Sequence, residues 1–423
     1  MRKPPRAFTI TKVSMVTLAS LTMVGPLAID MYLAAIPHIA NDLNTTAAMA
    51  QLTLTAFMIG MGLGQFLIGP LSDRIGRTRP LYISVVVSVL TALACVFAPS
   101  VELFIAARFV MGLAGATGVV LARAIIADST SGLQTAKIMG ILMMINGLGP
   151  VLAPLLGGFV LTVGTWRTVF AVLAGIMFVS MLAVYAVIRE SLPVEKRRTG
   201  SVLSTYKGVV EVMTMPRYRG FMFTLAFAFG SLFSYVSGST YVLQNVLGLT
   251  PLQFTWVFGL NSVGIVGSNM VATKLVGKVS MRKILMVGTS LMVLNAACLT
   301  AHFMMGISLV PTMIMLFIGT CSMGLIFGTA SSLAIMEARH TAGSASAMMG
   351  TVQFLVAGVA APLVGSGGAT ATLPMALCML GFAALAFLSL VTTPVKYGDW
   401  TPEGAEYHSN GGPKTGQLPT LGE

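Results

Sequence analysis

The chain has 423 residues, of which 56% are hydrophobic and 9% are charged, and its formal net charge is +12. An ordinary soluble domain carries about 25% charged residues, so this composition excludes a soluble fold and indicates a membrane protein with many spans. The positive charge does not indicate nucleic-acid binding. The basic residues lie in short segments between apolar runs, where they set the orientation and meet anionic lipid headgroups.

Twelve apolar segments are long enough to cross a bilayer as helices, which takes about 20 residues each. They cover residues 13–37, 48–70, 80–98, 103–122, 138–164, 166–188, 220–247, 252–273, 284–306, 308–335, 341–366 and 372–394. The alternation of apolar and polar residues that a transmembrane β-barrel needs is absent. The predicted fold class is therefore an all-α membrane protein with twelve transmembrane helices.

The distribution of basic residues predicts the orientation. When the N-terminus is placed in the cytoplasm, all of the 25 Lys and Arg residues except Arg108 and Arg167 fall in or beside cytoplasmic segments. Asp42 and Glu102 lie in loops that are then outside. The positive-inside rule therefore predicts that both termini are cytoplasmic.

A long polar break divides the twelve segments into six plus six. The expected organisation is an N-terminal six-helix bundle (1–188), a cytoplasmic linker (189–219), a C-terminal six-helix bundle (220–394) and a cytoplasmic tail (395–423), which is rich in Gly, Pro and Thr and is expected to be disordered. The halves also share a pattern, because VLAPLLGG at 151–158 and VAAPLVGS at 359–366 agree at five of eight positions. Such a repeat predicts a carrier whose site lies near the midplane between the halves. The alternative is that Pro and Gly simply recur in membrane helices.

The loop at 69–80 has the sequence GPLSDRIGRTRP. A glycine at its start allows two helix ends to approach closely, a second glycine permits a tight turn, and its Asp can pair with a neighbouring Arg or cap the next helix. An ordinary positively charged hairpin is the alternative. The segment closely resembles the signature loop of the major facilitator superfamily, which implies a cytoplasmic gating loop that latches the two halves. Its expected residues are Gly69, Asp73, Arg74, Gly76 and Arg77.

The segment 108–118, RFVMGLAGATG, presents small residues for close helix packing, while Arg108 is an intramembrane charge that needs a partner. It resembles the helix-4 motif of the same superfamily, although Met111 stands where the family often has Gln.

The segment 149–158, GPVLAPLLGG, resembles the motif of drug-exporting antiporters within that superfamily. Its prolines bend the helix and its glycines permit close contact with a neighbour. The residues concerned are Gly149, Pro150, Pro154, Gly157 and Gly158. The alternative is a transmembrane kink with no meaning for the direction of transport.

Asp30 is the one carboxylate within the twelve expected spans. A charge at membrane depth is costly, so such residues usually face a cavity and serve a pathway. The segment 26–37, PLAIDMYLAAIP, resembles the helix-1 signature of the Bcr/CflA group of drug:proton antiporters, although Ala34 replaces a usual Pro. The resemblance implies proton-coupled export of lipophilic antibiotics of the chloramphenicol or bicyclomycin type, by alternating access in the bacterial inner membrane and without a cofactor. Export of an endogenous metabolite, such as an amino-acid derivative or a sugar, is the alternative.

Asp30 and Arg108 are expected at similar depth, about 10 Å and about 9 Å below the outer helix ends. We therefore expect them to communicate, directly or through water. Removal from water favours the neutral acid and a nearby arginine favours the ionised one, so a proton and a drug would compete for one site. The alternative is a helix-end carboxylate that only fixes packing.

Polar residues within the spans are candidates for the cavity lining, because lipid-facing amides are rare. They are Tyr32, Asn146, Tyr235, Tyr241, Asn245, Asn261 and Gln353, and each can equally bridge helices. The sequence lacks metal-ligand spacing, a phosphate-binding loop and a Ser–His–Asp arrangement. We therefore expect no metal, no catalytic residue and no enzyme activity, and a chain that works as a monomer.

Overall fold

The computed structural model describes residues 10–130, 132–197, 207–368 and 372–395. Twelve long helices make up most of this part of the chain. They are α1 (Lys12–Asp30), α3 (Ala47–Ile75), α4 (Thr78–Val96), α5 (Val101–Ser129), α6 (Gly132–Val163), α7 (Trp166–Val187), α10 (Pro216–Thr240), α11 (Pro251–Leu275), α12 (Met281–Met305), α13 (Leu309–Glu337), α14 (Ala342–Gly365) and α15 (Leu373–Val391). Shorter elements are α2 (Ile36–Asp42), α9 (Lys207–Thr214), the 3₁₀ turns η1 (Leu33–Ala35), η2 (Val194–Lys196) and η4 (Arg339–Thr341), and the π-helix η3 (Tyr241–Val246).

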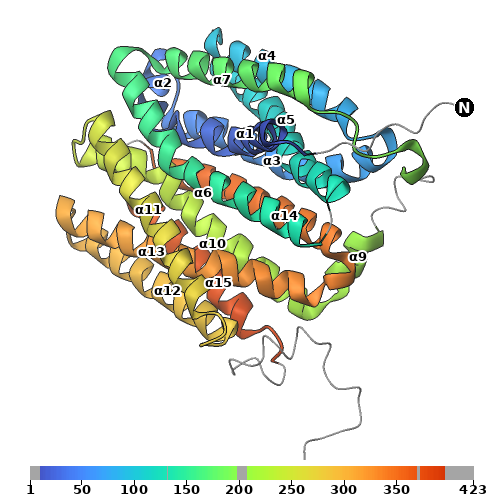
Figure 1. Ribbon diagram of the computed structural model, residues 1–423. Coiled ribbons are helices and arrows are strands. Elements are labelled where there is room, and N and C mark those ends of the chain that lie inside the picture. Colours follow the sequence, from blue (N-terminus) through green and yellow to red (C-terminus); the bar gives the residue numbers. More distant parts are fainter. Residues whose placement is uncertain (1–9, 131, 198–206, 369–371, 396–423) are drawn as a thin grey trace, which may run out of the picture.

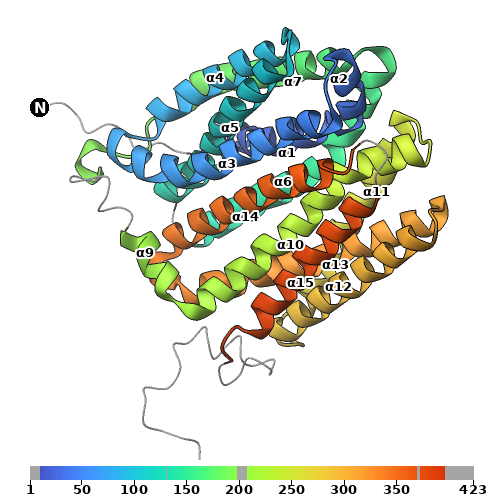
Figure 2. The ribbon, with the colours of Figure 1, turned by 180° about the vertical axis from the view of Figure 1, so that it is seen from behind.

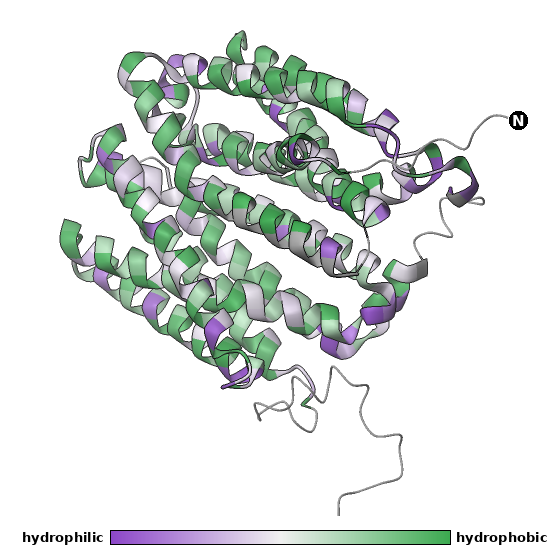
Figure 3. Cartoon of the chain, in the orientation of Figure 1, coloured by the Kyte–Doolittle hydropathy of each residue, from purple (hydrophilic) through white to green (hydrophobic). Residues whose placement is uncertain are grey.

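Helices α1–α7 form one bundle and helices α10–α15 form a second, as the two opposite views in Figures 1 and 2 show. We call the end of the molecule that carries α9 and the start of α1 the near end, and the end that carries α2 the far end. Figure 3 shows apolar residues along the helices and hydrophilic residues gathered around α9. Ten helical stretches of the described residues are long and apolar enough to cross a membrane. The chain is therefore a multi-pass membrane protein, and the predicted fold class is confirmed.

Small residues bring the helices close together inside and between the bundles. Within the first bundle, a Cβ atom added to Gly64 would lie 3.0 Å from the carbonyl oxygen of Leu113, so α3 and α5 almost touch through their backbones. Between the bundles, α3 packs on α14 and α6 packs on α11. A Cβ atom on Gly62 would lie 3.1 Å from the carbonyl oxygen of Thr351. Glycines are typical of helix contacts in membranes because they allow such close approach.

Most helices begin and end within a few residues of the predicted boundaries, and hydroxyl caps account for several of the starts. The hydroxyl of Thr46 accepts the N–H of Met49 at 3.2 Å, and Ser280 caps α12 in the same way. Helix α10 begins at Pro216, ahead of the expected residue 220, because proline is well suited to the first turn of a helix. The region expected to be a linker contains η2 and α9. The expected disordered tail, beyond residue 395, lies outside the described residues.

The first helix is broken, whereas the sequence predicts one continuous segment over 13–37. Helix α1 ends at Asp30, and η1 and α2 follow. The backbone turns at Met31 and Tyr32, ahead of η1, and Pro37 then lies in the first turn of α2, where its missing N–H is tolerated. The first helix of the second bundle is also irregular at the far end, where α10 continues as η3. The two irregular segments lie side by side, because Gln244 Nε2 donates to the carbonyl oxygen of Ala34 at 3.2 Å.

Candidate functional site

Asp30 lies at the broken end of α1, where the first bundle meets the second. Its side chain is buried, with the residue only 8% exposed. Among the described residues, its carboxylate forms no hydrogen bond and no ion pair within 4.0 Å. The turn η1, which follows shortly after Asp30, contacts α10 and α11 of the second bundle. Asp30 therefore lies next to the contact between the bundles.

Arg108 on α5 is fully buried and holds the end of α1. Its Nη1 donates to the carbonyl oxygen of Ala28 at 2.8 Å. The guanidinium carbon lies 4.4 Å from the ring centroid of Tyr32 and 4.5 Å from that of Phe57. The last carbonyls of a helix have no partner within the helix, and a cation there also complements the helix dipole. Arg108 is thus a cap for α1 that is held in place by aromatic rings.

The expected communication between Asp30 and Arg108 does not take the form of an ion pair in this conformation. The two are joined through the backbone instead, because Arg108 bonds to Ala28 and stacks on Tyr32, which flank Asp30 on either side. Met111 occupies the position of the usual glutamine, and its Sδ lies 3.6 Å from Nη1 of Arg108. The Nε and Nη2 atoms of Arg108 are buried and have no hydrogen-bond partner. The arginine therefore retains donors for an acceptor that enters the site.

The second basic residue that departs from the charge bias, Arg167, also has partners. Its guanidinium pairs with Asp42 at the far end and lies 4.3 Å from the ring of Trp166. The indole N–H of Trp166 donates to the same carboxylate at 3.0 Å. Both exceptions to the positive-inside pattern thus have a structural explanation, one as a helix cap and the other as a partner of an exposed carboxylate.

The second bundle presents buried polar groups toward this region. Asn261 Nδ2 on α11 donates to Tyr235 Oη at 2.8 Å, and both residues are 2% exposed. Tyr241 on η3 is buried and has no partner for its hydroxyl. Tyr32 itself is 3.3 Å from the hydroxyl of Thr53. Four of the candidate cavity residues are therefore buried at or near the contact between the bundles.

The other three candidates differ. Asn245 is exposed on η3, and Gln353 is partly buried on α14. Asn146 lies on α6, but its side chain is outside the described part of the structure. The sequence interpretation also missed Gln51, which is 1% exposed and whose Nε2 lies 3.4 Å from the carbonyl oxygen of Ser237 in the other bundle. The rarity of lipid-facing amides, applied to every Gln as well as every Asn, could have found it.

Polar atoms without partners gather on the helices that meet at the far end. They are Gln51 Oε1, Thr55 Oγ1, Ser237 Oγ, Thr240 Oγ1 and Tyr241 Oη. An unpaired buried polar group costs roughly 1–3 kcal/mol, so such groups are usually satisfied by water or a ligand in some state of the protein. The contact between α3 and the α10–η3 segment is therefore less stable than an apolar contact of the same size.

The glycines at 149–158 allow α6 to pack closely on the end of α1 and on α11 of the second bundle. A Cβ atom on Gly149 would lie 2.7 Å from the Cβ of Pro26, and one on Gly157 would overlap the backbone of Met31. A Cβ atom on Gly158 would overlap Thr255 on α11. Pro150 and Pro154 lie inside α6, as expected. The motif thus contacts α1 on both sides of Asp30 and also contacts the second bundle.

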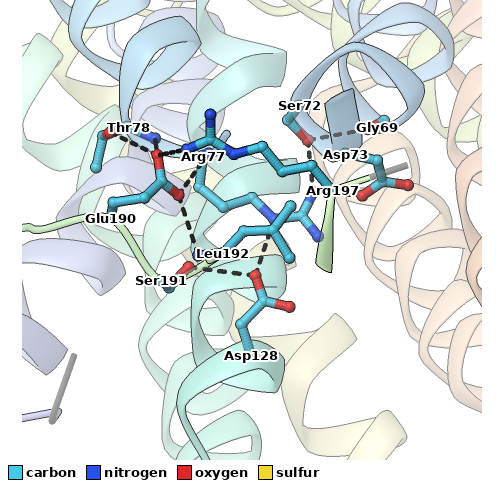
Figure 4. Close-up of polar contacts among 10 residues, drawn as sticks. All are labelled: Gly69, Ser72, Asp73, Arg77, Thr78, Asp128, Glu190, Ser191, Leu192 and Arg197. Carbon is cyan, nitrogen blue, oxygen red and sulfur yellow. Dashed lines mark hydrogen bonds and ion pairs between the residues drawn. The ribbon is translucent and has the colours of Figure 1, made fainter. Parts of the chain in front are cut away.

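The loop between α3 and α4 is organised around Arg77, as Figure 4 shows. Its Nη1 pairs with Asp73 at 2.6 Å, and its Nε pairs with Asp128 on α5 at 2.9 Å. Of the two roles considered for Asp73, the structure shows pairing with a neighbouring arginine. Gly76 has φ of +96°, which confirms the tight turn, and Arg74 is exposed. The role given to Gly69 is wrong, because no heavy atom lies within 4 Å of a Cβ atom placed there.

Glu190, which follows α7, completes this loop and was not anticipated. Its carboxylate accepts the backbone N–H of Arg77 at 2.9 Å and the hydroxyl of Thr78 at 2.8 Å, and it pairs with Arg197 at 3.5 Å (Figure 4). It therefore caps the start of α4. Partial burial opposes ionisation of Glu190, but the N–H groups of Arg77 and Leu192 and the donors of Thr78 hold its pKa below its ordinary value.

The second bundle uses arginines differently at the near end. Arg282 at the start of α12 donates to the carbonyl oxygens of Thr393 at 2.8 Å and Leu390 at 3.3 Å, at the end of α15. Arg217 on α10 pairs with Glu337 on α13 at 2.8 Å. Both arginines thus fix helix ends within the second bundle, while the Arg77 cluster joins α3, α4, α5 and the segment after α7 in the first.

Comparison with known proteins identifies the family. Residues 18–362 match the family described as Major Facilitator Superfamily. The chain is 34% identical to an uncharacterized MFS-type transporter, YdgK, of Bacillus subtilis over 88% of this chain and 93% of the relative. It is 29% identical to a bicyclomycin resistance protein homolog of Haemophilus influenzae, over 87% and 93% respectively.

The fold is also that of solved structures. A bacterial homolog of the human lysosomal transporter Spinster, crystallised in an inward-facing and unoccupied conformation, aligns with a TM-score of 0.68 at 17% identity, over 90% of this chain and 96% of that chain.

The chain belongs to the major facilitator superfamily, and it is therefore a membrane transporter of small molecules and not an enzyme. Within the superfamily, its relatives confirm the predicted likeness to the Bcr/CflA group of drug:proton antiporters.

Proposed function

We propose that the chain exports lipophilic small molecules, of the class that includes bicyclomycin and chloramphenicol, in exchange for protons. The observation that carries the proposal is Asp30, a buried carboxylate without a hydrogen bond among the described residues, next to the contact between the bundles. Relatives with similar sequences are named a bicyclomycin resistance protein homolog and a chloramphenicol resistance protein. We place the protein as a monomer in the inner membrane of a bacterium, with the near end and both termini in the cytoplasm.

The chemistry of exchange follows from the isolation of Asp30. An ionised carboxylate in an apolar site is unstable unless a proton or a partner compensates it. When the site opens outward, a proton from outside neutralises Asp30 and the cargo leaves. When the site opens inward, the proton leaves and cargo from the cytoplasm takes the place beside Asp30. Since one site serves both, the inward flow of protons drives the outward flow of cargo.

The energy of one proton is sufficient for useful export. A charge crossing the membrane gains about 2.3 kcal/mol per 100 mV. A proton motive force of about 170 mV then supplies about 4 kcal/mol, which sustains a cargo gradient of about a thousandfold. The ratio of one proton to one cargo molecule is part of the proposal.

The lining favours neutral or zwitterionic cargo. Tyr32, Tyr235 and Tyr241 offer aromatic rings with hydroxyls, and Asn261 offers an amide. Apolar surfaces with a few placed polar groups are typical of small-molecule sites. Asp30 is the one carboxylate within the twelve expected spans, which leaves no second acid at this depth for a divalent cation. The unpaired donors of Arg108 suit a carbonyl or nitro oxygen on the cargo.

The test replaces Asp30 by Asn, which keeps the shape and removes the titrating group. In proteoliposomes with an imposed pH gradient, we expect D30N to lose proton-driven transport of chloramphenicol while it still binds the drug. The matched control is E102Q, because Glu102 is an exposed carboxylate at the far end of α5. It should transport as the unmodified protein does. Unchanged proton-driven transport by D30N would refute the proposal.

A further inference from the structure

Helices α4 and α7 pack against each other and present an apolar surface to the lipid. Figures 1 and 2 show them on the outer side of the first bundle, away from the second. On α4 the exposed residues Ile83, Leu90 and Phe97 recur every seven residues, which places them on one face of the helix. Arg79 is exposed and lies four residues before Ile83, so it continues this face at the near end.

A second exposed arginine lies beside the first. Arg189 follows α7 by two residues. Tyr82 Oη on α4 donates to the carbonyl oxygen of Ile188 at 2.8 Å, and Thr78 Oγ1 donates to the carboxylate of Glu190 at 2.8 Å. The two acceptors are the residues immediately before and after Arg189, and the two donors enclose the other arginine in the first turn of α4. Both arginines are therefore fixed to the same short contact between α4 and α7.

A pair of tyrosines lies along the same contact and indicates its depth in the membrane. The rings of Tyr82 and Tyr185 stack with their centroids 4.5 Å apart, and Tyr185 is 44% exposed. Tyrosine is enriched where the apolar interior of a membrane meets the headgroups, because its ring is apolar and its hydroxyl is polar. The tyrosine pair thus places the two arginines at the level of the lipid headgroups.

The two arginines lack a counter-charge. Neither Arg79 nor Arg189 forms a hydrogen bond or an ion pair with any residue that the structure describes. Three carboxylates of this end are already paired, two of them with Arg77 and that of Glu190 with Arg197. Neighbouring cations repel each other, and an anion bound between them relieves that repulsion.

We propose that Arg79 and Arg189 together bind the phosphate group of an anionic phospholipid. A guanidinium group matches a phosphate in shape and charge, and basic sites between transmembrane helices bind anionic headgroups. The occupant is a lipid and not a soluble anion, because the site continues directly into the apolar faces of α4 and α7. The stacked tyrosines lie where the glycerol part of the lipid would rest. This site is separate from the proposed export site and does not depend on Asp30.

The bound lipid has a structural consequence for the near end. It joins the start of α4 to the segment after α7, which Glu190 also joins through its bonds to the N–H of Arg77 and to Thr78. The lipid and Glu190 thus hold the same two segments together, one from the membrane side and one from within the loop. A ligand that binds only the folded protein raises its unfolding temperature, so anionic lipid should stabilise the protein more than neutral lipid does.

The test counts bound lipids on the purified protein by native mass spectrometry, with phosphatidylglycerol and phosphatidylcholine of identical chains. Each arginine near a headgroup contributes enough that R79Q/R189Q should bind phosphatidylglycerol about thirtyfold more weakly, with phosphatidylcholine binding unchanged. R79K/R189K keeps both charges and should retain most of the binding. The matched control is K278Q/K283Q, which also removes two exposed cations at the near end, but from the second bundle. It should bind both lipids as the unmodified protein does.

Three results would overturn the proposal. The first is unchanged phosphatidylglycerol binding by R79Q/R189Q, and the second is an equal loss in K278Q/K283Q, because the binding would then reflect net charge alone. The third is displacement of phosphatidylglycerol by soluble glycerol phosphate, which would show a site for a free anion. Proton-driven transport, tested with D30N, can succeed or fail independently of all three.

Discussion

The cap that Arg108 places on α1 can be tested with the variant R108K, which keeps the positive charge and removes the planar guanidinium. In the structure the guanidinium lies within 4.5 Å of two ring centroids, those of Tyr32 and Phe57. A desolvated cation–π contact is worth up to about 2 kcal/mol, and lysine is a poor substitute at a stacked site. We expect R108K to lose about 2–3 kcal/mol of stability.

The assay is thermal unfolding of the purified protein in detergent, in which such a loss lowers the midpoint by a few degrees. The matched control is R167K. Arg167 also stacks on an aromatic ring, that of Trp166, but its side chain is 37% exposed and its ion pair lies at the surface. Exposed pairs contribute about 0–1 kcal/mol, so R167K should unfold close to the unmodified protein. If R108K is as stable as the unmodified protein, the charge alone caps α1 and the stabilising role of the stacked guanidinium is refuted.

Two further predictions concern the near-end loop and the packing of α6. The lowered pKa of Glu190 means that its contribution to stability is complete above its ordinary value near 4.5 and is lost as the pH falls through the lowered value. E190Q should therefore be about 1 kcal/mol less stable at neutral pH, and a difference that persists in acid at full size would contradict this. G157A should fail to accumulate as folded protein, because its Cβ atom would overlap the backbone of Met31. The control G175A, with no heavy atom within 4 Å, should fold normally, and normal folding of both variants would refute the close contact between α6 and α1.

The long helices were predictable because membrane insertion depends on local apolarity. The break after Asp30 was not, because hydropathy stays high through η1 and the change lies in the backbone at Met31 and Tyr32. The partner of Arg108 could not be predicted from the sequence for the same reason. The arginine bonds to a backbone carbonyl of Ala28 that is free only because α1 ends nearby, and no side-chain motif records such a group.

In the near-end loop, too, the sequence predicts some contacts and not others. The pairing of Asp73 with Arg77 could be proposed from their spacing of one helical turn. Glu190 could not, because it caps N–H groups that the turn at Gly76 exposes, more than a hundred residues earlier in the chain. In the second bundle, Tyr235 and Asn261 could be chosen as polar residues in apolar spans. Their mutual bond depends on where the fold places α10 relative to α11, and the sequence of either helix alone does not specify it.

The separation of Arg108 from Asp30 bears on how a proton could be exchanged at all. A cation 4 Å from the carboxylate, at an effective dielectric constant of about 20, would stabilise the charged form by about 4 kcal/mol, which corresponds to about three pH units. Such an acid would rarely accept a proton near neutral pH. By engaging Arg108 with the carbonyl of Ala28 and with aromatic rings, the fold leaves Asp30 without an ion pair among the described residues, so that a proton or a cargo molecule can bind beside it.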